Sequence, residues 1–487
     1  MASRSFPDAF AAWRATPGHS FSASAGPLPD CVAHEVSEAC RPGPGSILSL
    51  PFTSAAYRSL QAETEACLRR LLAIPDDFAV LFMGGGASAQ FALLPMNLFG
   101  GADCGGGHGQ SAVSGGALPA PPRRRALYVD SGHWSRRAIA EARRYGEVLV
   151  LALGGRPAAK PDAASGGDVA WAQRQASRGE GGPGVAMDDD GTPHVAPGST
   201  SLAIDAPTGG FAYAHFTTNE TADGLQFPAL PEVDVPLAAD MTSDLLTRPL
   251  DWCRLGVAYA GAQKTTGTPG LTFVVVRRTL LGPALAGTPR VMSYAEQAAA
   301  DSRLCTPPVL PVFVAHRMLH WIEGEGGVPA MAARLDRRHA VLQSAIAEAN
   351  ARFGPAYRQT VAPAWRSRVN PCFQLPDAAA CDAFLAAAEA VGLRDLRGHP
   401  AVGGVRVSLY HGVADAAVEA LAEFLVAFAR RRAADRRPAA AIRPGADTCP
   451  QGEAEVHAGA ACRPDAGGAV VPTVGPTALP PGRWGRA

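Results

Sequence analysis

The stretch VPLAADMTSDLLTRPLDWCRLGVAYAGAQKTTGTPGLT, residues 235–272, decides how the chain is interpreted. It holds two apolar runs, at 235–239 and 255–262. Asp240 directly follows the first run, and Lys264 stands just beyond the second. Short apolar runs bounded by polar residues predict buried strands. Ligands of open α/β sheets bind outside the carboxyl ends of the strands, so the acid and the amine are predicted to share one edge of a sheet.

Lys264 is one of two lysines in the chain, and the other is Lys160. The chain has 44 basic residues in all, which leaves 44 − 2 = 42 arginines. Arginine stays protonated in proteins, whereas lysine can lose its proton and attack a carbonyl. Lys264 is therefore predicted to be reactive, and the alternative is a surface lysine without a catalytic role. Lys160 lies in a Gly/Ala/Pro-rich segment and is expected to be incidental.

Composition excludes several classes of protein. The 487 residues suffice for two or three domains, and 47% of them are apolar. The formal net charge is zero, which argues against nucleic acid or an anionic membrane as a partner. No apolar stretch reaches membrane-spanning length. The ten cysteines form no CxxC pair, so reduced thiols and a cytoplasmic location are expected. The first 18 residues read as a plain extension, with organelle targeting as the less favoured alternative.

Strands and helices are predicted to alternate, which indicates an α/β sheet. FAVLFM at 78–83 predicts a strand, GGGAS a turn, and QFALLPMNLF at 90–99 a helix, so free N–H groups at a helix start could bind phosphate. Further predicted elements are a helix at 54–72, strands at 123–130, 148–153 and 271–278, and long helices after Pro308. A smaller α+β unit follows. No structure is predicted for 101–122, for 155–200, or for the tail from 436.

An amine, an acid and a phosphate-binding turn at one sheet edge suit pyridoxal phosphate. Lys264 would form the Schiff base and later move the substrate Cα proton, and Asp240 would keep the pyridinium nitrogen protonated. One alternative reads GGGASA, residues 84–89, as a dinucleotide fingerprint, but no acidic residue follows about 20 residues on. His316 and His320 stand at i and i+4. No third ligand is near them in the sequence, so they are interpreted as core histidines and no metal site is predicted.

Seven segments together resemble the phosphoserine aminotransferase family of class V, fold-type I pyridoxal-phosphate enzymes. They are FSASAGPLP (21–29), MGGGASAQFALLPMNLF (83–99), YVDSGHWSRRAIAEARRYG (128–146), TNETADGLQFPALPE (218–232), DMTSDLLTRPLDWCRLGVAYAGAQK (240–264), VNPCFQL (369–375) and GHPAVGGVRVSLY (398–410). The resemblance implies a large domain at 19–310, whose mixed, mostly parallel sheet has seven strands. It also implies a small C-terminal α+β domain at 311–435, with extensions at 1–18 and 436–487.

The resemblance also assigns roles to single residues. Lys264 matches the Schiff-base lysine, Asp240 the pyridinium partner, Trp134 the stacked indole and Arg406 the grip on the substrate α-carboxylate. The remaining implied cofactor contacts are Ala87, Ser88, Thr221 and Gln263, together with Cys305 and Thr306 reaching across from a second subunit. The family therefore implies a homodimer with shared sites. Its substrates would be small molecules, namely an amino acid and a 2-oxo acid.

The chain departs from the family on the substrate side. Pro51-Phe52-Thr53 replaces the usual Ser-His-Arg, and His399-Pro400 replaces His-Arg. Thr53 and His399 are kept as candidate substrate-binding positions. Thr265 and Cys305 replace two usual asparagines. Three functions remain open. They are phosphoserine:2-oxoglutarate transamination in serine biosynthesis, with other arginines such as the RRR run at 123–125 substituting for the missing ones, transamination of a less anionic amino acid, and a homologue that binds but does not catalyse.

Overall fold

The computed structural model describes residues 18–100, 124–152 and 210–435, and three short strands, β5 (Val185–Met187), β6 (Pro193–Val195) and β7 (Ala203–Ile204). Most of the expected N-terminal extension, the 101–122 insertion, Lys160 and the tail from 436 lie outside these residues. Within the described ranges, no helix is both long and apolar enough to span a membrane.

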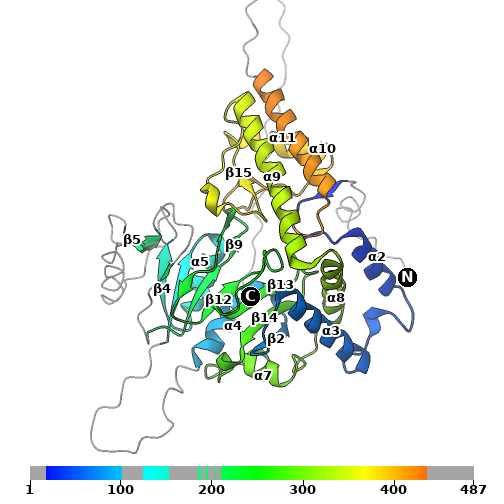
Figure 1. Ribbon diagram of the computed structural model, residues 1–487, viewed down its shortest axis with the longest axis vertical. Coiled ribbons are helices and arrows are strands. Elements are labelled where there is room, and N and C mark those ends of the chain that lie inside the picture. The colour runs from blue at the N-terminus through cyan, green and yellow to red at the C-terminus, as the bar shows by residue number, and fades with distance from the viewer. Residues whose placement is uncertain are drawn as a thin grey trace, which may run out of the picture. The chain divides into compact units, whose positions relative to one another are not determined.

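The N-terminal part of the chain forms a mixed sheet (Figure 1). Its strand order is β2-β14-β13-β12-β8-β3-β4-β6-β5. Its longer strands are β2 (Phe78–Met83), β3 (Arg125–Asp130), β4 (Glu147–Ala152), β8 (Tyr213–Thr217), β12 (Leu237–Asp240), β13 (Leu255–Gly261) and β14 (Thr272–Arg277). Strand β14 runs antiparallel to β13 and β2, and the neighbouring pairs from β13 to β4 are parallel. The predicted α/β class and fold type are confirmed. Strands β5 and β6 extend the sheet beyond β4, where no structure was predicted.

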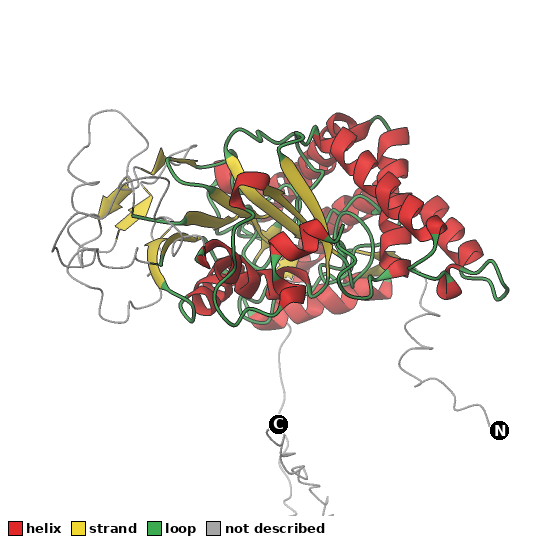
Figure 2. Ribbon diagram, turned by 90° about the horizontal axis from the view of Figure 1, so that it is seen from below, coloured by secondary structure: helices red, strands yellow, loops and turns green. Residues whose placement is uncertain are grey.

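Both faces of the sheet are buried under hydrophobic clusters. Successive side chains of each strand point to opposite faces, so one strand contributes to both clusters. Phe273 and Val275 of β14 belong to one hydrophobic cluster, and Val274 and Val276 to the other. Helices α3 (Ala55–Leu72) and α8 (Val309–Gly324) contribute to the first cluster. Helices α4 (Gly86–Leu98), α5 (His133–Ala142) and α7 (Tyr294–Ala299) contribute to the second. Figure 2 shows the sheet between these helices.

Two helix starts can be compared with the sequence prediction. Helix α3 begins after Ser54, whose hydroxyl accepts a hydrogen bond from the Tyr57 N–H at 3.1 Å, in agreement with the predicted start. Helix α4 begins at Gly86, four residues before the predicted Gln90. Gly85 and Gly86 have φ values of 89° and 64°, which glycine adopts without steric cost. The early start places the N-terminus of α4 directly beyond β2.

The C-terminal part has a hydrophobic core of its own. It is built from α9 (Gly327–Phe353), α10 (Ala378–Ala390) and α11 (Asp415–Asp435), with the short strands β15 (Cys372–Phe373) and β17 (Val405–Arg406). Helices α9 and α11 lie side by side (Figure 1). The long helix α9 passes from one core to the other, because Met331 packs with the sheet and Leu335 packs with the second core.

Shorter elements join these parts. Strands β9 (Asn219–Glu220) and β10 (Leu225–Gln226) form an antiparallel pair, β11 (Glu232–Val233) pairs with β7, and β1 (His19–Ser20) pairs with β16 (Leu393–Arg394). Helix α2 (Asp30–Ala39) packs against α8. The buried amide of Asn219 donates to Asn370 Oδ1 at 2.8 Å, which ties the strand ends of the sheet to the C-terminal part.

Candidate active site

The carboxyl ends of the sheet strands open into a pocket of about 350 Å³. Asp240 is the last residue of β12, and Lys264 lies three residues beyond β13, the parallel neighbour of β12. Both side chains line the pocket, as the sequence predicts. The full lining is Ala23, Ser24, Gly85, Gly86, Ala87, Ser88, Trp134, Thr217, Asn219, Thr221, Asp240, Thr242, Ser243, Gln263, Lys264, His399 and Arg406.

Lys264 has a perturbed amine. The pKa of Lys264 is lowered to about 8, because the lowering by burial and by the Arg406 guanidinium exceeds the rise caused by the Asp240 carboxylate. The Nζ atom lies 5.5 Å from the centroid of the Trp134 ring. An amine with a pKa near 8 has a substantial neutral fraction at physiological pH, and the neutral form is the one that attacks a carbonyl.

Asp240 is almost fully buried, with 5% of its surface exposed. Burial raises the pKa of this carboxyl, and hydrogen bonding to Thr242 and the charge of Lys264 oppose the rise. Its Oδ1 accepts a hydrogen bond from the Thr242 N–H at 3.0 Å. A buried carboxylate is stabilised when it accepts a hydrogen bond from a protonated nitrogen of a ligand.

Trp134 forms a flat wall of the pocket. It is the second residue of α5, and its indole Nε1 donates to Thr221 Oγ1 at 2.9 Å. The backbone N–H groups of Trp134 and Ser135 each donate to the carboxyl of Glu220 at 2.8 Å. These bonds hold the indole where a planar ring could stack on it.

Glu220 is a residue that the sequence interpretation missed. Its side chain is fully buried, and burial raises its pKa to about 7 while hydrogen bonds to Ser135 and Trp134 lower it. It accepts the unpaired N–H groups at the start of α5 and so fixes Trp134 from outside the pocket. The pattern Asn-Glu-Thr around it was noticed, but nothing local indicates that its carboxyl reaches a helix 85 residues earlier.

The start of α4 forms another part of the pocket wall. Ala87 and Ser88 line the pocket together with Gly85 and Gly86, so the N-terminal N–H groups of this helix border the cavity. The Gly86 N–H donates to Thr272 Oγ1 at 2.8 Å, which anchors the turn to β14. Helix N-termini with free N–H groups bind phosphate, so this end suits a phosphate group.

Two of the predicted substrate residues come from the C-terminal part. Arg406 is the last residue of β17, and its Nη1 donates to the Thr221 carbonyl at 3.2 Å. The ring of His399 lies 4.3 Å, between centroids, from that of His133 at the start of α5, and the two ring planes are tilted by 46°. The Arg137 guanidinium carbon lies 5.4 Å from the Trp134 ring centroid. Burial lowers the pKa of both histidines, and the positive charges of Arg137 and Arg406 lower the pKa of His399 further.

Three predicted residues stand apart from this pocket. Thr53, Cys305 and Thr306 are exposed and are not among its lining residues. Phe52 packs against the sheet core, and Pro400 is exposed.

Comparison with known proteins places the chain in a family. The model of the class-V aminotransferases matches residues 188–421. Phosphoserine aminotransferase of Laribacter hongkongensis is 35% identical over 85% of this chain and 99% of its own length, and that of Stenotrophomonas maltophilia strain K279a is 37% identical over 84% and 98%. The solved structure of phosphoserine aminotransferase from Bacillus circulans subsp. alkalophilus is 30% identical, with a TM-score of 0.67 over 85% of this chain and 99% of that one. The chain belongs to the phosphoserine aminotransferase family of class V aminotransferases.

Proposed function

We propose that the protein is a pyridoxal-phosphate enzyme that transfers the amino group between L-glutamate and 3-phosphohydroxypyruvate, giving 2-oxoglutarate and O-phospho-L-serine. One observation carries this proposal. A buried acid and a perturbed lysine face one pocket, with an indole wall, a helix start and an arginine around them. The family supports the substrate pair, because the relatives are phosphoserine aminotransferases over nearly their whole length.

The pocket residues fit the cofactor. Lys264 would hold its aldehyde carbon, Asp240 its ring nitrogen, and Trp134 one face of its ring. Ala87 and Ser88, at the start of α4, would hold its phosphate, and Thr221 and Gln263 would add polar contacts. The buried hydroxyl of Thr217 also lines the pocket and has no hydrogen-bond partner within the described part of the chain, which fits a bound polar group.

Asp240, Lys264 and Trp134 would each have a different role in the reaction. Pyridoxal phosphate, when bound, supplies a carbonyl for the amino group and a ring that accepts electron pairs. Asp240 would keep a proton on the ring nitrogen, and its burial would strengthen that hydrogen bond. The Lys264 amine would take the proton from the substrate Cα as a general base and release it again as a general acid. Trp134 excludes water from one face.

Arg406 is suited to the α-carboxylate of the substrate, because a guanidinium binds a carboxylate through two parallel hydrogen bonds. The substrate phosphate needs further hydrogen-bond donors, which neutral imidazole and guanidinium N–H groups supply. His133, His399 and Arg137 form a group beside Trp134, and His399 and Arg406 line the same pocket. We propose that this group takes the phosphate, in place of the arginine that Pro400 replaces.

A second candidate is transamination of a less anionic amino acid. The exposed Thr53 and Pro400, and the core packing of Phe52, favour it, because none of these side chains carries a positive charge. Loss of a guanidinium that pairs with a buried anion costs about 2–5 kcal/mol. The two candidates differ in the substrate alone.

We also propose a homodimer, in which Cys305, Thr306 and Thr53 of one protomer border the pocket of the other. Their exposure and their positions outside this pocket support that assignment. The described cysteines are free thiols, which suits a cytoplasmic enzyme. The two domains are proposed to span 19–310 and 311–435, and the packing changes core further along the chain, within α9 between Met331 and Leu335.

A half-reaction assay tests the substrate. Holoenzyme is mixed with one amino acid at a time, and the cofactor absorption and the released 2-oxo acid are followed in a single turnover. The proposal expects conversion of both O-phosphoserine and glutamate. Conversion of alanine or serine, with O-phosphoserine inert, would establish the second candidate, and no conversion of any amino acid would indicate a homologue that binds without catalysis.

A further inference from the structure

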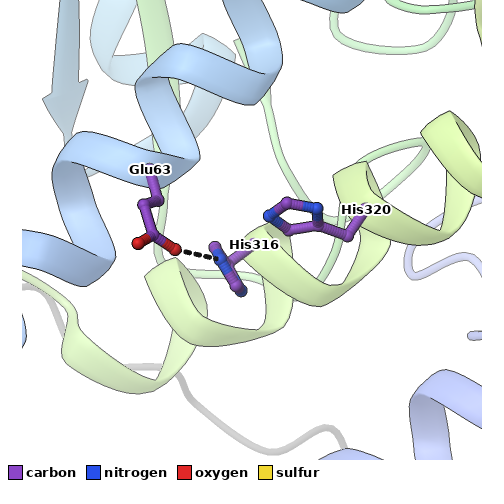
Figure 3. A group of neighbouring side chains, drawn as sticks. All are labelled: Glu63, His316 and His320. Atoms are coloured by element: carbon purple, nitrogen blue, oxygen red, sulfur yellow. Dashed lines mark ion pairs between the residues drawn. The ribbon is translucent and has the colours of Figure 1, made fainter.

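Helices α3 and α8 pack against each other away from the catalytic pocket and carry metal-binding side chains at their contact. On α8, His316 and His320 are separated by one turn, so their rings lie on the same face of the helix. The sequence shows no third ligand near them. The fold supplies one, because Glu63 of α3 points at His316 (Figure 3).

The distances within this group match a coordination site. The ligand atoms of Glu63, His316 and His320 all lie within 4.8 Å of one another. Glu63 Oε2 is 3.5 Å from His316 Nε2, and the centroids of the two imidazole rings are 4.4 Å apart. Metal bonds of about 2.1 Å in tetrahedral geometry put neighbouring ligand atoms about 3.4 Å apart, so small side-chain rotations complete the arrangement.

His316 gives an independent indication of a ligand. Only 9% of its surface is exposed, and neither ring nitrogen makes a hydrogen bond within the described residues. Its contact with Glu63 is close but lacks hydrogen-bond geometry. Buried imidazole nitrogens almost always have a partner, and an imidazole without one is an available metal ligand.

The geometry points to a binding site, formed by Glu63, His316 and His320, for a divalent transition-metal ion such as Zn²⁺. Two imidazoles and one carboxylate suit zinc and its neighbours, whereas calcium and magnesium prefer an all-oxygen set. Three protein ligands leave a fourth position for water. The ion would add a second polar link between α3 and α8, which pack together in the sheet core and are already joined by the Arg70–Glu323 ion pair.

A competing triad shares one member of this group. Cys67, His320 and Glu323 also lie within 4.8 Å of one another. Glu323 is already held by Arg70, through bonds of 2.8 and 3.1 Å. The Cys67 thiol is also engaged, because it donates to Glu323 Oε2 at 3.8 Å. The triad with His316 therefore has the lower cost of metal binding.

The test uses holoenzyme freed of metal with a chelator. Zn²⁺ is titrated by calorimetry, and melting curves are recorded with and without excess Zn²⁺. We expect one ion per chain and a rise of about 4 °C in the melting temperature. Glu63→Gln and His320→Gln should each weaken binding at least about tenfold and remove the rise. His19→Gln, which alters an exposed histidine on β1, is the matched control and should behave as the parent does.

The visible spectrum of bound Co²⁺ identifies the ligands. Cys67→Ser should leave the spectrum and the affinity unchanged, and His316→Asn should abolish both. The opposite result would assign the ion to the competing triad and overturn the proposal. Equal Zn²⁺ affinity in the parent, Glu63→Gln and His320→Gln proteins would place the ion elsewhere and would also overturn it.

Discussion

The cofactor side and the substrate side of the pocket are built differently. Asp240, Lys264, Trp134 and the start of α4 each follow a different strand of one sheet, so strand register fixes their relative positions. Arg406 and His399 come instead from a two-residue strand and a loop of the C-terminal part. Loop-borne groups vary more freely than groups at the ends of core strands. The side proposed to hold the cofactor is thus fixed by the sheet, and the side proposed to select the substrate is the one where the sequence departs from the family pattern.

The largest effect is expected on the rigid side. Lys264→Ala removes the group proposed to hold the cofactor and move the Cα proton, so kcat should fall by at least about 10⁴-fold. Turnover with glutamate and 3-phosphohydroxypyruvate measures it. Lys160→Ala changes the other lysine of the chain and should leave kcat unaltered. Equal loss in both variants would mean that the catalytic amine has been misassigned.

Arg406 should matter less, because it acts on binding. Arg406→Lys keeps the charge but loses the paired hydrogen bonds, worth about 1.5–3 kcal/mol, so kcat/KM should fall about 10- to 100-fold for O-phosphoserine and glutamate alike. Arg397→Lys alters an exposed arginine nearby, paired at the surface with Asp382, and serves as the control. A loss confined to one of the two amino acids would show that Arg406 does not bind the shared α-carboxylate.

The pKa of Lys264 predicts how cofactor loading depends on pH. The pKa lies near 8 in the folded protein, below the usual 10.5, so the amine is mostly protonated below pH 8 and mostly neutral above it. The rate at which cofactor-free protein takes up pyridoxal phosphate should rise about tenfold per pH unit up to pH 8 and then level off. Uptake is followed by visible absorption, with Nα-acetyl-lysine as the reference amine.

Asp240→Asn sharpens this prediction. The Asp240 carboxylate raises the pKa of Lys264, so its removal should move the levelling point to lower pH. A profile that still climbs to pH 10 in the parent protein would show that the amine is not perturbed.

The smallest effect is expected at Arg137. This exposed guanidinium is proposed to help bind the substrate phosphate, and exposed charges contribute about 0.2–1 kcal/mol. Arg137→Gln should lower kcat/KM for O-phosphoserine up to about fivefold and leave the value for glutamate unchanged. Salt should reduce the difference between parent and variant, because the interaction is screened. Equal values for O-phosphoserine in the two proteins would remove Arg137 from the phosphate group.

Local patterns were sufficient for most of the fold. The predicted strand at 78–83 and the helix to Leu72 agree with β2 and α3, because alternation and helical periodicity are properties of the segment itself. Local patterns failed where the tertiary structure decides. Strand β17, which carries Arg406, is only two residues long, and β6 pairs with β4 in a segment for which no structure was predicted.

The same limit applies to the site. Asp240 and Lys264 could be paired from the sequence, because parallel strands bring their carboxyl ends to one edge. Glu220 and Glu63 could not be assigned, because each acts on a helix far away in the sequence, α5 for Glu220 and α8 for Glu63. No periodicity or spacing reports such contacts.

The scarcity of lysine has a practical consequence. Within the described residues Lys264 is the only primary amine on a side chain, and its lowered pKa makes it more reactive than an ordinary surface lysine. An amine-directed reagent should therefore label this position in protein stripped of its cofactor and spare it in loaded protein. Peptide mass spectrometry would then read the degree of loading directly, in a mixed sample and without an enzymatic assay.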